Sequence, residues 1–397
     1  MVTGGAGFVG RHFVKRICSD YTVIIVDDLS SESAIHPDVW PPHLKCSDAI
    51  FIRLDCRTFF IRQRKFYKDI SLFVHLAAVV GGRSKIEGDP AGIALSDLSI
   101  DLAAFQWAVL NRPLNMIYFS SSAAYPVKHQ QQSPDHGSKP FTLLEESMLD
   151  FKGGDIGNPD LTYGWSKLTG EYLASVLREH YNLNISVYRP FSGYGEDQHS
   201  AYPFMAILQR VLELNQTHLI TQSQRDKIQI WSNATRDFVY IDDLVSCVLN
   251  TFENHNSHAI NLATGTPTSM HELALMMANI SGLLDKDINK NGVDIEIADL
   301  FPKGVDYRVG SSKLAHEVGC TFPTSLSSAI EKSIDFLSSE YHSRKNNESI
   351  FDYVDLKKEE QLPPADFDEF LNDDIAAKYS SHQCIGGSQS IKTEFMQ

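Results

Sequence analysis

The chain of 397 residues is long enough for two or three domain units and for a sizeable hydrophobic core. Hydrophobic residues make up 43% and charged residues 21%, which is the balance of a soluble globular protein rather than a disordered or fibrous one. The formal net charge of −15 argues against nucleic acid and anionic membrane surfaces as main partners, because both require a dense cationic face.

From residue 2 to about 190, short β-branched runs alternate with longer amphipathic stretches, a pattern that predicts a parallel sheet covered by helices. The predicted strands are 22–26, 49–54, 72–77, 115–119 and 185–188. The predicted helices are 8–18, 91–110 and 163–181, where apolar residues recur at steps of three and four. We therefore predict an α/β fold with a Rossmann-like, doubly wound parallel sheet over residues 1–190, with returning segments from about 228–265.

A glycine-rich turn stands at the start of the chain, where the first strand should lead into the first helix. Gly4, Gly7 and Gly10 allow a tight turn and a close approach of the backbone to a pyrophosphate at the helix N-terminus. Only three residues precede Gly4, although a typical strand has about five or six. We expect a short first strand, so that the true start lies upstream or the chain is a fragment that binds a dinucleotide poorly.

Two carboxylates follow predicted strands at positions suited to the adenosine end of a dinucleotide. Asp27 comes seventeen residues after Gly10, where it can accept both ribose hydroxyls and repel a 2′-phosphate, which favours NAD over NADP. A turn or helix cap is the alternative for Asp27, and Arg11 beside the glycine turn argues mildly for NADP. Asp55 either binds the adenine amino group or caps a loop.

Tyr163 and Lys167 are four residues apart, on one face of a predicted helix. An ammonium group beside a phenol lowers the pKa of the phenol towards neutrality, which would make Tyr163 a general base for a sugar hydroxyl. A serine run at 120–122 ends the fifth predicted strand, at the sheet edge where doubly wound folds place their active sites.

After residue 190 the pattern is mixed and predicts a smaller α/β substrate-binding lobe over 191–340. Its predicted elements are a helix at 203–214, a strand at 238–241, a helix through residue 250 and a strand at 259–263. Residues 345–397 are acidic, contain Pro363-Pro364 and end in a Gly/Ser/Gln-rich stretch, so we expect a disordered acidic tail.

Six segments in order resemble an extended short-chain dehydrogenase/reductase, in the branch of nucleotide-sugar epimerases, dehydratases and reductases, over roughly residues 2–340. They are Gly4 to Gly10, Asp27 to Ser30, His75 to Ala78, Ser120 to Tyr125, Tyr163 to Lys167 and Arg236 to Asp243. The resemblance implies NAD as cofactor and a nucleotide-diphosphate sugar as substrate. It also implies three catalytic residues: Ser121, Tyr163 as the base, and Lys167 as a ligand of the nicotinamide ribose.

The resemblance implies two sets of binding residues. The cofactor contacts would be Gly4, Gly7, Phe8, Val9, Gly10, Asp27, Asp55, Cys56, Leu76, Ala77, Ala78, Tyr163, Lys167 and Pro190. The substrate contacts would be Gly82, Arg83, Ser122, Ser192 and Arg236. Arg236 would neutralise the diphosphate, unless it is an ordinary surface cation, and a second cation on the diphosphate would have to be Lys303 or Arg308.

The family's shared step is hydride transfer from a sugar carbon, usually C4, to NAD. Dehydratases carry an Asp-Glu pair where this chain has Ser122 and Ala123, and 3,5-epimerases carry a Cys at the position of Ala123. The loop at 79–83 and Tyr125-Pro126 nevertheless resemble GDP-mannose 3,5-epimerase and GDP-fucose synthase. A 4-epimerase needs none of the missing groups; a 4-reductase or dehydrogenase, a 4,6-dehydratase and a non-catalytic NAD-binding protein remain alternatives.

The remaining expectations concern the thiols, the location and the assembly. The cysteines form neither a CxxC pair nor a zinc-type cluster, which predicts no metal site and six reduced, mostly buried thiols: Cys18, Cys46, Cys56, Cys247, Cys320 and Cys384. No signal peptide precedes the first motif and no run of about eighteen apolar residues occurs, so we expect a cytoplasmic protein. Family members commonly dimerise through four helices, which here would be 91–110 and 163–181 of each copy.

Overall fold

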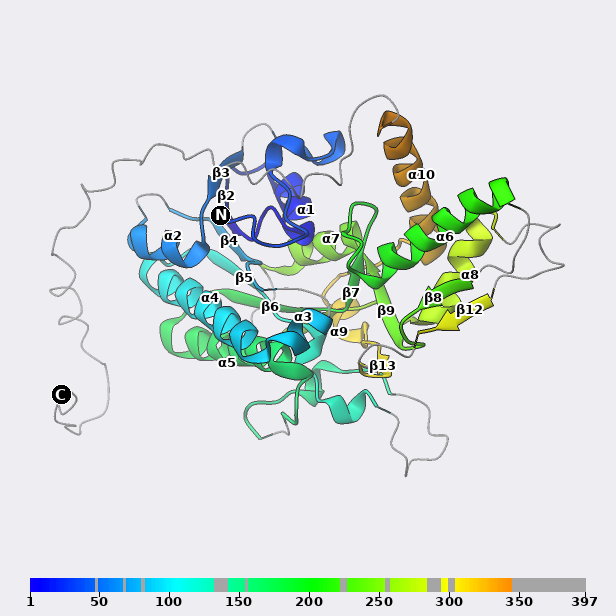
Figure 1. The fold of residues 1–397 in the computed structure, drawn as a ribbon. Helices are drawn as coiled ribbons and strands as arrows, with labels where there is room; N and C mark the ends of the chain where they lie inside the picture. The colour runs from blue at the N-terminus through cyan, green and yellow to red at the C-terminus, as the bar shows by residue number, and fades with distance from the viewer. Residues whose placement is uncertain are drawn as a thin grey trace, which may run out of the picture. The chain divides into compact units, whose positions relative to one another are not determined.

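A computed structural model of the chain (Figure 1) describes ten segments of it. They are 1–46, 49–66, 69–79, 83–131, 142–153, 156–221, 227–253, 258–283, 294–298 and 304–344. All of them belong to one compact unit, Met1–Glu348. The predicted tail at 345–397, Gly82 and Lys303 lie outside the described residues, and the side chain of Arg83 is not described.

A seven-stranded parallel sheet forms the larger part of the fold, in the order β10-β6-β5-β4-β1-β2-β3. The strands are β1 (Val2–Thr3), β2 (Val23–Asp27), β3 (Ala49–Arg53), β4 (Leu72–His75), β5 (Asn115–Phe119), β6 (Ile185–Pro190) and β10 (Ala259–Leu262). The strand order reverses between β1 and β4, as in a doubly wound sheet, and the prediction of an α/β Rossmann-like fold is confirmed.

Helices cover both faces of this sheet because its central strands are apolar on both sides. On one face, α1 (Phe8–Ile17) packs against α7 (Ile241–Thr251). On the other, α4 (Pro90–Asn111) packs between α2 (Cys56–Arg62) and α5 (Leu161–Tyr181), as Figure 1 shows. Every residue of β4 and β5 is buried, as expected for strands of a covered parallel sheet.

The first strand is short, as expected, yet it lies at the centre of the sheet. Val2 is in register with Ile25 of β2 on one side and with Val74 of β4 on the other. Met1 extends this contact, because its amino group donates to the carbonyl of Leu72 at 2.7 Å. The glycine turn therefore follows a strand that is paired on both sides.

Outside the large sheet, the described residues after 190 form a four-stranded sheet, a two-stranded sheet and three longer helices, which we call the smaller lobe. The sheets consist of β7 (Ser192–Tyr194), β9 (Thr235–Tyr240), β11 (Pro267–Ser269) and β13 (Tyr307–Arg308), and of β8 (Lys227–Ile230) with β12 (Asp294–Ile297). The three longer helices are α6 (Pro203–Thr221), α8 (Met270–Ile280) and α10 (Leu326–Arg344). Two further helices of the chain, α3 (Arg83–Gly88) and α9 (Lys313–Glu317), are only six and five residues long. Short 3-10 helices occur at Pro37–Val39, Pro42–Leu44, Ser122–Ala124, Val127–His129 and Glu146–Met148.

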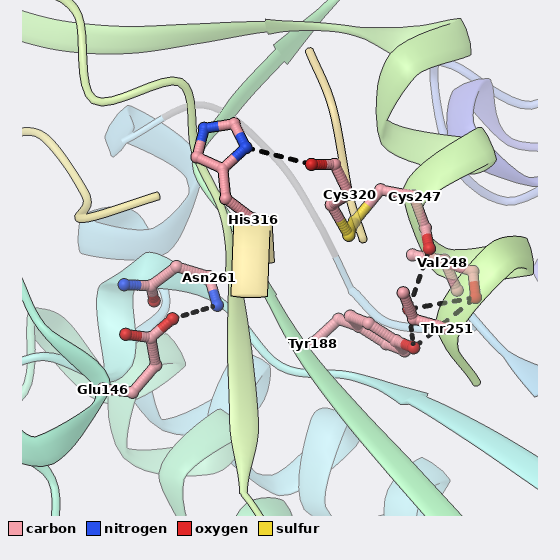
Figure 2. The surroundings of a disulfide bond; sticks show 8 residues. All are labelled: Glu146, Tyr188, Cys247, Val248, Thr251, Asn261, His316 and Cys320. Atoms are coloured by element: carbon pink, nitrogen blue, oxygen red, sulfur yellow. Dashed lines mark hydrogen bonds between the residues drawn. A yellow bond between two sulfur atoms is a disulfide. The ribbon is translucent and has the colours of Figure 1, made fainter. Parts of the chain in front are cut away.

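A disulfide joins Cys247 to Cys320, so the prediction of reduced thiols is wrong for this pair. Cys247 lies on α7 and Cys320 follows α9, and both are buried where these segments meet (Figure 2). The two cysteines are 73 residues apart in sequence, and only the packing of the lobe against α7 brings them together. Cys18, Cys46 and Cys56 are free thiols as predicted, and Cys384 lies outside the described residues.

One described helix, α4, is long and apolar enough to cross a membrane by length and composition alone. It packs between α2 and α5 and carries two fully buried carboxylates, Asp97 and Asp101. These aspartates interrupt the apolar sequence of α4, so the helix contains no run of about eighteen consecutive apolar residues. A helix that covers the core of a globular protein has the same composition.

Candidate active site

A cavity of about 510 Å³ opens at the carboxyl ends of the strands of the large sheet and reaches residues of the smaller lobe. All fourteen residues predicted to contact the cofactor line it. So do Ser121 and three of the predicted substrate contacts, Ser122, Ser192 and Arg236. Gly82 and the side chain of Arg83 lie outside the described part of the chain.

The glycine turn has the close backbone contacts that a phosphate cradle requires. Gly4 has a φ of +70°, and a Cβ there would lie 2.6 Å from the backbone nitrogen of Ala77. A Cβ on Gly10 would lie 2.3 Å from the carbonyl oxygen of Gly4. Gly7 precedes α1 without a side-chain cap, so the N-terminus of this ten-residue helix faces the cavity with backbone N–H groups available to an anion.

Asp27 ends β2 and holds the turn together. Its carboxylate accepts hydrogen bonds from the backbone of Ala6 at 3.0 Å and of Leu29 at 2.9 Å, one on each oxygen. Burial raises the pKa of Asp27, and the two backbone donors partly offset that effect. Asp27 therefore does stabilise the turn, as the alternative interpretation predicted. Each carboxylate oxygen keeps a second lone pair, with which it can accept a hydrogen bond from a diol in the cavity.

We expect the protein to bind NAD more tightly than NADP by about 1–3 kcal/mol, because Asp27 can accept hydrogen bonds from the ribose and repels a 2′-phosphate. Isothermal titration with both dinucleotides measures the difference. Asp27→Asn should shrink it, whereas Asp38→Asn should not, since the Asp38 side chain is 86% exposed and does not line the cavity. Equal or tighter binding of NADP by the unmodified protein would contradict the assignment.

Asp55 caps α2, so its alternative interpretation as a cap is also realised. The carboxylate accepts a hydrogen bond from the backbone of Arg57 at 2.8 Å and forms an ion pair with the Arg57 guanidinium at 2.5 Å. These bonds lower the pKa of Asp55. Arg57 also lines the cavity and donates to Ser99 at 2.9 Å, a position that the sequence analysis did not single out. The sequence signal that could have predicted this role of Arg57 is its position two residues after a capping Asp.

Tyr163 is the third residue of α5, and Lys167 lies one turn later with its Nζ 6.0 Å from the Tyr163 ring centre. Ser121 caps the 3-10 helix Ser122–Ala124 by accepting from the backbone N–H of Ala123 at 3.1 Å, and it lines the same cavity as Tyr163. A Cβ on Gly164 would lie 2.3 Å from the carbonyl oxygen of Ala123, so this glycine allows α5 to approach the serine turn. The three predicted catalytic side chains therefore meet in one cavity.

A buried set of polar groups surrounds the Lys167 ammonium. Asp101 lies 3.5 Å from Lys167 Nζ and also accepts from the Tyr118 hydroxyl at 2.6 Å. His75 Nε2 contacts Asp101 at 3.2 Å, and its other ring nitrogen contacts Thr3 Oγ1 at 2.7 Å. Burial opposes the charge on Lys167, but Asp101, Tyr163 and Asp97 together outweigh it and raise the pKa of Lys167.

The pKa of Tyr163 is raised rather than lowered, which corrects the expectation that Lys167 would bring it towards neutrality. Burial is the largest cause, and Lys167 opposes it. The carboxylates of Asp97 and Asp101 add to the rise, because they lie close enough to offset the ammonium charge. Tyr163 is therefore a phenol at neutral pH in the absence of a bound cation.

Arg11 is not available to a 2′-phosphate, contrary to the alternative drawn from the sequence. Its side chain is buried and forms an ion pair with Asp197, which also accepts from His12 Nε2 at 2.9 Å. Burial opposes charge on both acid and imidazole, yet their pairing raises the pKa of His12 to about 9 and lowers that of Asp197. Arg11 thus ties α1 to the loop before α6.

Arg236 and Arg308 are register partners on the parallel strands β9 and β13, and both line the cavity. Arg308 donates to Gln130 and to Asp160, each at 2.6 Å, which fixes its position. Of the two candidates for a second cation, Arg308 is thus placed beside Arg236, while Lys303 lies outside the described residues. Two neighbouring guanidinium groups provide donors and charge for a diphosphate.

Comparison with known proteins places these features in a family. A family model described as the NAD dependent epimerase/dehydratase family matches residues 1–263. The chain is 27% identical over 281 residues to a putative UDP-glucose 4-epimerase of Methanocaldococcus jannaschii, covering 69% of this chain and 79% of the relative. It is 22% identical over 290 residues to GDP-mannose 3,5-epimerase of Arabidopsis thaliana, covering 70% and 67%.

Among solved structures, UDP-glucose 4-epimerase of Thermotoga maritima with UDP-glucose superimposes with a TM-score of 0.65. The two chains are 21% identical, and the match covers 85% of this chain and 98% of the other. At this identity the likeness concerns the fold.

Proposed function

Because the chain belongs to the NAD-dependent epimerase/dehydratase family, we propose that it is a nucleotide-sugar 4-epimerase that works through a transient 4-keto sugar. The observation that carries the proposal is the meeting of Ser121, Tyr163 and Lys167 in one cavity. The dinucleotide cradle lies in the same cavity, and so do the paired arginines Arg236 and Arg308.

The residues of the cavity fit NAD. The positions of Gly4 and Gly10 leave no room for a Cβ, and the uncapped start of α1 offers donors to a pyrophosphate. Asp27 would hold the adenosine ribose, and Lys167 would hold the nicotinamide ribose. NAD, when bound, supplies the acceptor and then the donor of a hydride.

The chain's own residues would supply the proton transfers and the alignment. Tyr163 would take the proton of the C4 hydroxyl and later return one, with Ser121 hydrogen-bonded to the same oxygen. Arg236 and Arg308 would hold the diphosphate while the 4-keto sugar turns its other face to the cofactor. The order of events then needs no acid or base beyond Tyr163.

Other reactions of the family need groups that this site lacks at the matching positions. Ser122 and Ala123 stand where dehydratases carry an acidic pair. Ala123 is buried, and its backbone is engaged by Ser121 Oγ and by the N–H of Asp160. This arrangement favours oxidation and re-reduction at C4 over loss of water or epimerisation at C3 or C5.

The test is to incubate purified protein with UDP-, GDP-, CDP- and dTDP-sugars and to analyse the products by mass spectrometry and NMR. An unchanged mass with inverted configuration at C4 supports the proposal. Loss of water would identify a dehydratase, and net consumption of NAD or NADH would identify a dehydrogenase or reductase. No product from any of the sugars, with NAD bound, would favour a non-catalytic NAD-binding protein.

We also propose a homodimer built on α4 and α5, which lie side by side (Figure 1). Leu95 and Leu102 on α4 are 69% and 46% exposed, and Trp165 and Tyr172 on α5 are 41% and 51% exposed. Each pair is seven residues apart, so both helices present apolar side chains on one face. Such residues are buried when the helices of two copies pack together.

Leu102→Glu combined with Tyr172→Glu should convert the dimer to a monomer, because two charges per copy would be buried at the interface. Light scattering after size-exclusion chromatography measures the mass of each species. Leu114→Glu is a matched control, since Leu114 is 70% exposed and lies outside both helices. A monomeric unmodified protein, or a double variant that remains dimeric, would contradict this interface.

We propose a cytoplasmic location, as expected for an enzyme of nucleotide sugars. The disulfide Cys247–Cys320 argues in the other direction, because disulfides are rare in reducing compartments. Rapid alkylation of the protein in intact cells decides between the two. Six labelled cysteines support the cytoplasm, whereas four indicate an oxidising compartment.

A further inference from the structure

Gln198 is a buried amide side chain that lines the active-site cavity, and the reaction described above gives it no role. The residue is only 7% exposed. Its Nε2 donates to the backbone carbonyl of Gly193 at 2.8 Å. Its Oε1 is also buried and has no hydrogen-bond partner among the described residues. A buried amide oxygen without a partner is costly, so the donor that it lacks should come from a molecule bound in the cavity.

The contact with Gly193 decides which end of the amide is free. A backbone carbonyl can only accept a hydrogen bond, so the group beside it must be the NH2 of Gln198, and the free end must be the oxygen. An amide oxygen is a neutral acceptor that has no proton to give. Its partner must therefore be an O–H or N–H group, and a carboxylate or phosphate oxygen does not fit.

The segment that carries Gln198 is held in place by contacts outside the cavity. The N–H of Gln198 donates to the carbonyl of Gly195 at 3.2 Å, and a Cβ on Gly195 would lie 2.7 Å from Cγ2 of Ile241. The preceding residue, Asp197, forms the buried ion pair with Arg11, which also donates to the Asp197 carbonyl at 2.6 Å. The acceptor oxygen is therefore pre-positioned, which favours discrimination between ligands.

The Gln198 amide is bonded to the part of the cavity that carries predicted substrate contacts. Gly193 lies on β7 and is in register with Val239 of β9, the strand that also contains Arg236. Ser192, the neighbour of Gly193 on β7, lines the same cavity. The free oxygen of Gln198 therefore belongs to the substrate side, where the donors of a nucleotide sugar are the hydroxyl and amide groups of its sugar.

We propose that Gln198 is a specificity-determining residue whose Oε1 accepts a hydrogen bond from a hydroxyl of the sugar, or from the N–H of an acylated amino group at the same carbon. The inference rests on the proposed function, because it takes a nucleotide sugar as the occupant of the cavity. It narrows the substrate to sugars without a carboxylate at that carbon, since two acceptors would then face each other. A sugar that lacks the donor would leave Oε1 buried and unpaired.

The test is a binding cycle that combines one variant with a series of sugar analogues. UDP-, GDP-, CDP- and dTDP-glucose are titrated calorimetrically into the NAD-loaded protein, and the ligand that binds most tightly becomes the probe. The 2-, 3-, 4- and 6-deoxy derivatives of the probe are then titrated into the unmodified protein and into Gln198→Met, which keeps the length of the side chain without the acceptor. One derivative should bind the unmodified protein about tenfold more weakly than the probe does.

Gln198→Met should also bind the probe about tenfold more weakly, because a donor of the sugar is left unpaired. The critical derivative should bind this variant as tightly as the probe does, within about twofold, since one hydrogen bond cannot be lost twice. Gln229→Met is the matched control: Gln229 is exposed on β8 and lies outside the cavity, so every affinity should equal that of the unmodified protein. If Gln198→Met does not fold, Gln198→Asn, whose acceptor is one methylene further back, takes its place in the cycle.

Two results in the variant would overturn the inference. If Gln198→Met weakens the binding of the probe and of every derivative by the same factor, Gln198 is only a structural partner of Gly193. If the variant loses affinity for NAD and shows no coupling to any sugar hydroxyl, the oxygen belongs to the cofactor.

The cycle and the product analysis fail independently. Coupling to one hydroxyl without an epimerised product supports the inference, while the proposed function fails. A product epimerised at C4 without coupling overturns the inference and leaves the proposed function intact. If none of the four nucleotide sugars binds, both are overturned.

Discussion

Tyr163→Phe is expected to lower turnover at least about a hundredfold while leaving the affinity for NAD nearly unchanged. The variant loses only the hydroxyl oxygen, which lies in the same cavity as Ser121 and would exchange a proton with the sugar in the proposed reaction. The ring and Lys167 remain, so the groups that would hold the ribose are unaltered. Turnover is measured with the sugar nucleotide identified as substrate, and NAD affinity by isothermal titration.

Tyr181→Phe serves as the control, because Tyr181 ends the same helix and is 47% exposed. It should behave like the unmodified protein in both measurements. Near-normal turnover in Tyr163→Phe would remove Tyr163 as the proton-transfer group. Loss of NAD affinity in step with turnover would instead give Tyr163 a role in binding.

Asp197→Ala is expected to destabilise the fold by about 3–5 kcal/mol, because it leaves Arg11 and His12 buried without their common partner. The loss is measured by urea unfolding at pH 7. Asp242→Ala is the control: Asp242 also bonds to His12, at 3.3 Å, but is 52% exposed, so its removal should cost about 1 kcal/mol or less. Similar losses in the two variants would contradict the buried ion pair.

The same cluster predicts a pH dependence with a defined sign. The pKa of His12 is raised to about 9 in the folded protein, mainly because hydrogen bonds to Asp197 and Asp242 outweigh burial. The stabilisation by His12 is fully present below pH 6.5, the ordinary pKa of histidine, and is lost as the pH rises through 9. Asp197→Ala should lose this slope between pH 6.5 and 9, and an unchanged slope would show that another group causes it.

The elements of the large sheet were predictable because each strand is an apolar run with its own local boundaries. The predicted strand 115–119 agrees with β5, and the predicted helix 163–181 falls within α5. The cofactor side of the cavity was predictable for a related reason. Gly4 and the serine turn follow strands of one parallel sheet, Asp27 ends another, and the carboxyl ends of such strands meet at one edge.

What the sequence did not reveal depends on contacts between distant segments. From its place beside the glycine turn, Arg11 looks like a phosphate ligand. In the fold, however, it forms a buried ion pair with Asp197, which is 186 residues away in the sequence. The pairing of Cys247 with Cys320 likewise requires the lobe to pack on α7. Asp101 looks like an interruption of an amphipathic helix in the sequence, but in the fold α5 brings Lys167 Nζ within 3.5 Å of it.

The position of β10 at the edge of the large sheet bears on how the protein is made. The chain leaves the sheet after β6, builds strands and helices of the smaller lobe, and returns only at Ala259–Leu262 to pair with β6. During synthesis, β6 is therefore an open edge strand while roughly seventy further residues emerge from the ribosome, and open edges invite pairing with other chains. Release of the nascent chain before residue 262 would leave a sheet that lacks its outer strand, and such products should aggregate rather than accumulate as a working cofactor-binding half.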